Sequence, residues 1–336
     1  MRGDRTMRQC FGLAGFSLIA LVLSGCKTIT LDESFVFQPG QFGDPNAPRL
    51  TPMKYESVFA APSDLTIDVW ADGQTAQHII KSSEFVKTTL THDVLPYSGE
   101  RLAITHMERE GPSRPMVVHC GGNASDRYES GVLYAQKMIS FADVVMFDYP
   151  GYGDSTGQAS ADSLRAANQA LADYVNAEMG GQRPLILWGH SLGGFVCADM
   201  AARLTHVDGI ILEATATNAQ DVSKAVIPWY AKLFIRARTA ESLEAYDMTE
   251  TLKTATAPIL ILGATKDKTL PVDLSRKLSV DLKAAGRDVT YTEFPKANHI
   301  SIPTQENFLT TVEDFVEGLG EVELRQSDAR AVQYRP

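Results

Sequence analysis

The chain has 336 residues, of which 44% are hydrophobic and 8% aromatic, a composition typical of a globular protein with one large core or two small ones. Its formal net charge is −10 at pH 7, and it contains no Lys/Arg-rich run, so we expect no nucleic-acid partner. Its four cysteines form no CxxC pair and no Cys/His metal spacing, which argues against a structural metal site.

The first 25 residues differ from the rest of the chain. Arg2, Arg5 and Arg8 make a basic start, and residues 11–23 follow without a charge. This run is shorter than the roughly 18–20 apolar residues of a membrane span and is typical of the apolar region of a secretory signal. We predict that residues 1–25 are a signal peptide, the alternative being a buried N-terminal helix. Cleavage would change the net charge from −10 to −12, because three arginines and one aspartate are lost.

The signal ends in "LSGC", residues 23–26, which resembles the lipobox of bacterial lipoproteins. The resemblance implies cleavage before Cys26 and acylation of that cysteine, for example with palmitate. Several acyl chains hold a protein firmly on a membrane. In lipoproteins of Gram-negative bacteria, a residue other than aspartate after the cysteine implies release to the outer membrane, and here that residue is Lys27. We therefore expect an exported protein, lipid-anchored to the bacterial cell envelope at the periplasmic face of the outer membrane.

Two cysteines of the mature chain then remain, since Cys10 leaves with the signal and Cys26 takes lipid. Export permits a disulfide, so Cys120 and Cys197 pair if the fold brings them together. Small buried thiols are the interpretation that we favour for these two residues.

Residues 26–62 are rich in proline and show few periodic apolar positions, which predicts a tether or irregular extension. We assign residues 63–320 to one domain and residues 321–336 to a polar tail. In this domain, residues 84–92 alternate in polarity, "LPYSGE" follows, and residues 101–108 resume the pattern. This arrangement predicts an antiparallel hairpin.

Five short apolar runs follow, each separated from the next by enough chain for a helix. They are "PMVVHC", "ADVVMFDYP", "PLILWGH", "DGIILEAT" and "PILILGAT". Continuous apolar strands alternating with helices predict an α/β fold with a mostly parallel, doubly wound sheet. Apolar side chains at helical spacing predict helices between the second and third runs and near the C-terminus, at Leu164, Ala167, Leu171, Tyr174 and Val175 and at Phe308, Val312, Phe315, Val316 and Leu319.

An insertion of residues 214–257 lies between the last two of these runs. Its length predicts a small helical cap over the carboxyl edge of the sheet. Its aromatic residues either line a pocket or pack the cap onto the core. They are Trp229, Tyr230, Phe234 and Tyr246.

The segment "PLILWGHSLGG" predicts a strand, a sharp bend and a helix, and it matches G-x-S-x-G in that setting. Side chains two positions before and after the serine would clash in such a bend, and Gly189 and Gly193 avoid this clash. Ser191 then projects above the sheet at the start of a helix, where amides favour negative charge. The motif predicts a nucleophile, the alternative being a structural turn serine.

A serine nucleophile needs a base, and in this strand–bend–helix setting the partners follow in the order Ser, acid, His. His299, in "FPKANHI" after the predicted strand "VTYTEF", is the one histidine well beyond both Ser191 and a strand-end acid. Asp267 follows the run "PILILGAT" and is the predicted acid, with Glu213 at the end of "GIILE" as the alternative.

Other titratable residues receive structural roles. We expect His206 and Asp281 at the surface, His119 as a residue that braces a loop, and His190 to point away from Ser191 because adjacent residues diverge at the bend.

An acyl-transfer site also needs two amide donors for the oxyanion. One is predicted to be the amide of Leu192, after the nucleophile. The other comes from the loop in "VVHCGGNAS", where Asn123 and Gly122 are the two candidates.

These motifs resemble those of the α/β-hydrolase superfamily over roughly residues 84–320. "HCGGNA" is similar to its HG-type oxyanion loop, with Cys120 in place of the usual glycine. "DYPGYGDSTG" is similar to its D-x-R-G-x-G-x-S segment, with Pro150 where arginine is common. Both departures occur in a branch of small-cap serine hydrolases with peptidase-like and depalmitoylase-like members.

The resemblance and the motifs together predict a lipid-anchored serine hydrolase that cleaves carboxylic esters or thioesters of a small-molecule acyl substrate. Ser191 attacks, His299 moves the proton, Asp267 orients His299, and no metal or organic cofactor is required. The alternatives are an amidase or peptidase of the same fold and a non-catalytic binding lipoprotein. The oligomeric state stays open.

Overall fold

The computed structural model describes residues 27–39, 53–71, 74–111, 113–127, 130–179, 183–225, 227, 230–231 and 235–319. The predicted signal peptide, Cys26 and the predicted tail lie outside these residues, as do Trp229 and Phe234. Among the described helices, none has both the length and the apolarity to cross a bilayer.

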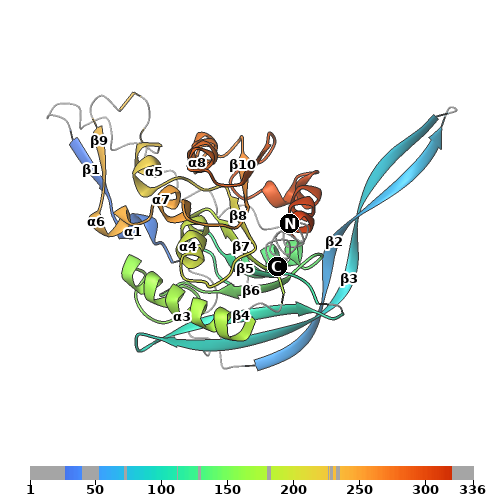
Figure 1. Cartoon of the computed structure of the whole chain (residues 1–336), viewed down its shortest axis with the longest axis horizontal. Helices are drawn as coiled ribbons and strands as arrows, with labels where there is room; N and C mark the ends of the chain where they lie inside the picture. The colour runs from blue at the N-terminus through green and yellow to red at the C-terminus, as the bar shows by residue number, and fades with distance from the viewer. Residues whose placement is uncertain are drawn as a thin grey trace, which may run out of the picture.

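Within the described residues, nine strands form one sheet in the order β11-β10-β8-β7-β5-β6-β4-β3-β2 (Figure 1). Six of these strands run parallel: β5 (Met116–Cys120), β6 (Asp143–Phe147), β7 (Leu185–His190), β8 (Gly209–Glu213), β10 (Ile259–Ala264) and β11 (Val289–Phe294). Every residue of β5 to β8 and of β10 is buried, because helices cover both faces of the sheet. The predicted α/β-hydrolase architecture of the sheet is confirmed.

Alternate residues of the parallel strands enter two separate apolar clusters, one on each face of the sheet. Leu187 joins one cluster with side chains of α3 (Ala161–Met179), α4 (Leu192–Ala201) and α8 (Asp273–Ala284). Ile186 joins the other cluster with α2 (Ser130–Met138) and the helix at residues 308–319. The amphipathic stripes predicted for α3 and for the last helix are therefore core positions.

The predicted hairpin is confirmed in β3 (Gln74–Tyr97) and β4 (Glu100–Arg109), which pair antiparallel. Its two-residue turn has positive φ at Ser98 (45°) and Gly99 (80°), the conformation that matches the twist of the flanking strands. Beyond the hairpin, β3 pairs with β2 (Met53–Ala71) in a long ribbon that extends away from the body (Figure 1).

The prediction of an irregular extension over residues 26–62 is wrong where the chain is described. Residues of this segment form β1 (Lys27–Leu31), α1 (Glu33–Val36) and the first half of β2. Leu31 and Phe37 are buried and anchor the segment, so few apolar side chains suffice to fix it. Pro62 lies in β2, an edge strand, where a residue without an N–H is tolerated.

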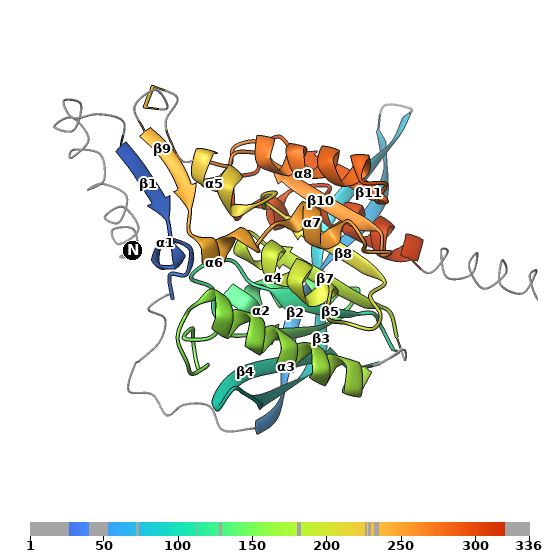
Figure 2. The same ribbon diagram turned by 60° about the vertical axis from the view of Figure 1, so that its left-hand side comes forward.

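The cap that follows β8 contains a strand as well as helices, which corrects the prediction of a helical cap. Its elements are α5 (Ala219–Ala225), β9 (Ile235–Thr239), α6 (Glu241–Glu244) and α7 (Met248–Leu252). Strand β9 pairs in parallel with β1, so the start of the described chain completes the cap (Figure 2). Tyr246 is buried against Phe37 and Phe195 and packs the cap onto the core, whereas Tyr230 is 59% exposed.

Candidate active site

Ser191 lies between β7 and α4 in a strained backbone conformation, with φ 55° and ψ −117°. Such a conformation persists in a non-glycine residue only where its surroundings enforce it. The Ser191 N–H donates to the Glu213 carbonyl oxygen over 2.9 Å, and Thr215 Oγ1 donates to the Ser191 carbonyl oxygen over 2.8 Å. A Cβ at Gly189 would overlap the carbonyl of Gly193, so the bend requires glycine there.

The structure brings the side chains of Ser191, His299 and Asp267 together. His299 Nε2 lies 2.9 Å from Ser191 Oγ, and His299 Nδ1 lies 2.6 Å from Asp267 Oδ2. Since the Asp267 carboxylate accepts from Nδ1–H, Nε2 is free to accept the Ser191 hydroxyl proton. The other oxygen of Asp267 accepts from the amides of Thr269 (2.8 Å) and Leu270 (2.9 Å), which fixes the carboxylate.

His190 contacts His299, an interaction that the sequence did not predict. Its Nε2–H donates to the His299 carbonyl oxygen over 2.9 Å, and its ring lies 5.1 Å from the His299 ring. Burial, together with the neighbouring His299, lowers the pKa of His190 to about 4. The ring is therefore neutral near pH 7 and keeps the tautomer that donates.

Glu213, the alternative acid, does not contact His299. It is completely buried, accepting from Trp188 Nε1–H over 3.0 Å and lying 3.5 Å from the Tyr134 hydroxyl. Burial raises the pKa of Glu213 to about 8. The geometry thus favours Asp267 as the partner of His299.

Three other titratable residues considered in the sequence, His119, His206 and Asp281, make their described contacts elsewhere. His119 is buried and stacks on Tyr134, with ring centroids 4.8 Å apart, and burial lowers its pKa to about 3. His206 lies at the surface and pairs with Asp208, while Asp281 pairs with Lys277 on α8.

The loop after β5 passes directly beside Ser191, since a Cβ built on Gly122 would lie 3.6 Å from Ser191 Cβ. The Gly121 carbonyl accepts from Tyr149 OH over 2.5 Å, and the Gly122 carbonyl accepts from Ser125 Oγ over 2.6 Å. In a planar trans peptide the N–H points opposite to the C=O. These two bonds therefore fix the directions of the amides of Gly122 and Asn123, the two candidate oxyanion donors.

Asn123 is also held through its side chain. Its Oδ1 accepts from Tyr152 OH over 2.8 Å and from the backbone N–H of Gln38 over 3.0 Å. The second of these bonds ties the loop after β5 to the segment that carries β1 and α1.

A disulfide joins Cys120 to Cys197, with their Cα atoms 6.1 Å apart, so the preference for two separate thiols is wrong. The fold places the end of β5 against the second turn of α4, an approach that one sequence does not reveal. A Cβ on Gly193 would overlap the carbonyl of Cys120, which shows how closely the end of β5 and the start of α4 pack.

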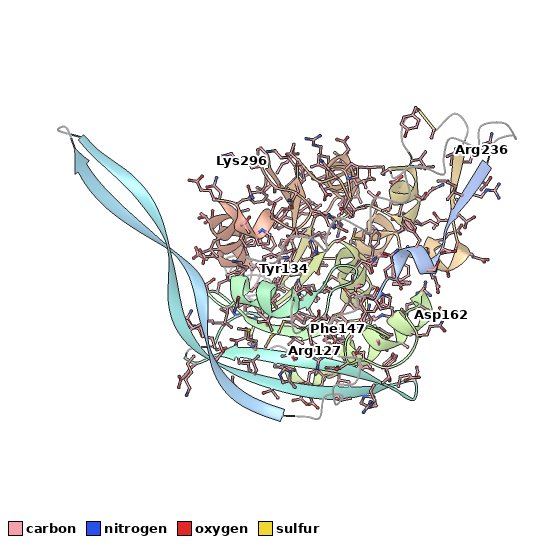
Figure 3. The ribbon with its side chains drawn as sticks, turned by 180° about the vertical axis from the view of Figure 1, so that it is seen from behind. Arg127, Tyr134, Phe147, Asp162, Arg236 and Lys296 are labelled. Atoms are coloured by element: carbon pink, nitrogen blue, oxygen red, sulfur yellow. A yellow bond between two sulfur atoms is a disulfide. The ribbon has the colours of Figure 1, made fainter. Side chains whose placement is uncertain are left out.

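Arg127, labelled in Figure 3, is a buried residue four positions after Asn123, and the sequence alone suggested no role for it. Its guanidinium pairs with Asp148 and, over 2.8 Å, with Asp154, and its Nε donates to Thr105 over 3.0 Å. Ser155 Oγ donates to the Asp148 carbonyl over 2.7 Å. The segment "DYPGYGDSTG" is thus a brace for the loop that passes Ser191.

Comparison with known proteins agrees with this architecture. A family model described as the alpha/beta hydrolase fold matches residues 116–246. Among solved structures, the esterase Pf2001 of Pyrococcus furiosus superposes with a TM-score of 0.54 at 13% identity, covering 68% of this chain and 91% of that chain. The chain has the α/β-hydrolase fold.

Among curated proteins, the chain is similar to lysophosphatidylserine lipase ABHD12 of Rattus norvegicus, with 30% identity over 229 residues, 64% of this chain and 53% of that protein. Protein ABHD12B of Homo sapiens is 30% identical over 220 residues, 60% of each chain. The chain spans about half to three fifths of the length of these relatives.

Proposed function

We propose that this protein is a serine hydrolase that cleaves carboxylic ester bonds through an acyl-enzyme on Ser191. The observation that carries the proposal is the continuous hydrogen-bonded line from Ser191 Oγ through His299 to Asp267. A hydroxyl is a weak nucleophile unless a base takes its proton, and this line supplies the base.

In the proposed mechanism, Ser191 Oγ attacks the acyl carbonyl as its proton passes to His299 Nε2. The imidazolium is stabilised by Asp267 and then gives the proton to the leaving alkoxide. Water, deprotonated by His299, attacks the acyl-enzyme and releases the acid. The amide of Leu192 and that of Asn123 or Gly122 hold the oxyanion, and losing one such donor typically costs about 10²- to 10³-fold in rate.

For the substrate class we propose a lipid ester with a single acyl chain, such as a lysophospholipid. This choice is supported by the similarity to proteins named lysophosphatidylserine lipases. A thioester is chemically accessible to the same acyl-enzyme route.

We also propose that the protein is exported and anchored by lipid on Cys26. The disulfide between two fully buried cysteines supports export, because such bonds persist in oxidising compartments. Replacing Cys26 with serine should then release the protein from the membrane fraction, and an unchanged distribution would contradict the anchor.

A fluorophosphonate probe tests the mechanism. The wild-type protein should be labelled, and Ser191→Ala should abolish labelling. A wild-type protein that stays unlabelled, under conditions that label known serine hydrolases, would point instead to a binding lipoprotein.

A substrate panel then separates the reaction classes. We expect hydrolysis of p-nitrophenyl esters and of lysophosphatidylserine, and no turnover of aminoacyl amides. The opposite preference would identify an amidase or peptidase.

A further inference from the structure

The proposed lipid attachment point lies directly beside the cap. Cys26 immediately precedes Lys27, the first residue of β1, and consecutive Cα atoms are about 3.8 Å apart. Lys27 is in register with Ile235, the first residue of β9. An acylated Cys26 would therefore join the folded body at the shared starting end of β1 and β9, without an intervening tether.

The surface around this end carries exposed basic, hydroxyl and aromatic side chains. Arg236, labelled in Figure 3, and Arg238 are exposed and lie on one face of β9. They are in register with the exposed Thr28 and Thr30 of β1. We call these four residues together with Tyr230 the ribbon surface.

Tyr230 belongs to the same end of the ribbon. Its neighbour Ala231 accepts, through its carbonyl oxygen, the N–H of Ile235 over 2.8 Å, and Ile235 is in register with Lys27. Tyr230 is 59% exposed. An amphipathic ring of this kind is enriched where protein meets the headgroup region of a membrane.

The charge of the ribbon surface differs from that of the whole chain. The chain carries a net charge of −10, yet the ribbon surface contains two arginines and no acidic residue. Basic side chains beside an anionic bilayer are attracted to its headgroups, while the acidic remainder of the protein is repelled.

We propose that the ribbon surface rests on the bilayer that holds the lipid anchor, with Arg236 and Arg238 against anionic headgroups and Tyr230 in the interface. The inference rests on the proposed function and deepens it. Gln38, the twelfth residue after Cys26, donates its N–H to Asn123 of the oxyanion loop. Even a fully extended segment of this length spans at most about 43 Å, so the anchor keeps the site close to lipid substrate.

The docked orientation can be measured on the mature lipidated protein in vesicles of phosphatidylglycerol and phosphatidylcholine. Mass spectrometry first establishes acylation of Cys26. Since Cys120 and Cys197 are bonded to each other, a cysteine introduced by Tyr230→Cys supplies a free thiol for a fluorescent NBD label. We expect doxyl-labelled lipids to quench this label.

The matched control is Val280→Cys. Val280 is 65% exposed on α8, which α5 separates from β1 and β9 (Figure 2). Its label should keep its fluorescence. Equal quenching at both positions, or none at either, would overturn the proposed orientation, and so would an unacylated Cys26.

Activity gives a second, independent measurement. Arg236→Glu should lower turnover of a lysophospholipid in anionic vesicles about five-fold or more, and leave hydrolysis of a water-soluble p-nitrophenyl ester unchanged. Lys283→Glu, at the end of α8, makes the same charge change and should affect neither assay.

The two substrates keep the two proposals apart. A wild-type protein that hydrolyses neither substrate would contradict the proposed hydrolase function. Normal activity on the soluble ester, with Arg236→Glu and Lys283→Glu behaving alike on vesicles, would overturn only the membrane-facing role of the ribbon surface.

Discussion

The carboxyl ends of β8 and β10 each supply an acidic residue, but the two carboxyl groups meet different surroundings. Glu213 is the last residue of β8, and the strand directs its side chain under α2, where it contacts Trp188 and Tyr134. Asp267 lies three residues beyond β10, in a turn whose amides hold one oxygen while the other faces His299.

This difference shows what decides the role of a strand-end acid. A residue inside a strand has its direction set by the pleat, so its side chain enters one of the covered faces. A residue in the following turn can reach across the edge of the sheet to a partner from another loop. The four predictions below test this contrast, from the largest expected effect to the smallest.

Replacing each acid with its amide should give the largest difference in kcat between the two positions. Asp267→Asn should lower kcat by about 10³- to 10⁴-fold, because the amide no longer fixes the His299 tautomer that accepts the serine proton. Glu213→Gln should change kcat less than about three-fold, since it lies outside the hydrogen-bonded line. Steady-state kinetics on a p-nitrophenyl ester, with folding checked by circular dichroism, measures both. The reverse pattern would transfer the acid role to Glu213.

His190 connects the buried region around Tyr134 to His299. In His190→Phe the ring is kept but the donor to the His299 carbonyl is lost, so we expect kcat to fall about 10- to 100-fold with little change in KM. The exposed His206 provides the control, and His206→Phe should leave both constants unchanged. A large rise in KM with normal kcat would contradict a positioning role.

The buried Glu213 should also make stability depend on pH. Its pKa of about 8 lies above the usual 4.5, so between these values the unfolded chain binds fewer protons and stability falls as pH rises. The lowered pKa values of His190 and His119 act in the opposite direction, but only below about pH 6.5.

Of these three groups, only Glu213 therefore makes the stability depend on pH between 6.5 and 8. We expect the free energy of unfolding in urea to fall by up to about 2 kcal/mol over this interval. In Glu213→Gln, whose side chain resembles the protonated acid, the free energy of unfolding should fall much less over the same interval. An equal decline in both proteins would show that Glu213 is not protonated in the fold.

Tyr134→Phe should have the smallest effect. It removes a hydroxyl 3.5 Å from Glu213 while Trp188 continues to donate, so we expect a loss of at most about 1 kcal/mol in urea unfolding. Tyr230→Phe, at an exposed position, is the control. A loss well above 2 kcal/mol would mean that Tyr134 is the main partner of Glu213.

Local sequence patterns determined much of this protein. Strands covered on both faces consist of continuous apolar runs, so the parallel strands could be predicted from residue order. So could the hairpin turn within residues 95–100 and the amphipathic helices. The sharp bend at Ser191 could also be predicted from local sequence. The two glycines that its steric crowding requires, Gly189 and Gly193, lie within five residues of each other. Asp267 and His299 could be proposed because strand-end loops gather at one edge of a parallel sheet.

Contacts between distant segments were decided only by the tertiary structure. The disulfide at 120 and 197, the pairing of β1 with β9, the support of His299 by His190 and the burial of Glu213 each depend on elements far apart in sequence. The spacing of apolar residues predicts which face of a helix or strand is apolar, but it does not predict which element packs against that face. Neighbours fixed by packing, such as Leu31 and Phe37 within a proline-rich segment, therefore appear only once the chain has folded.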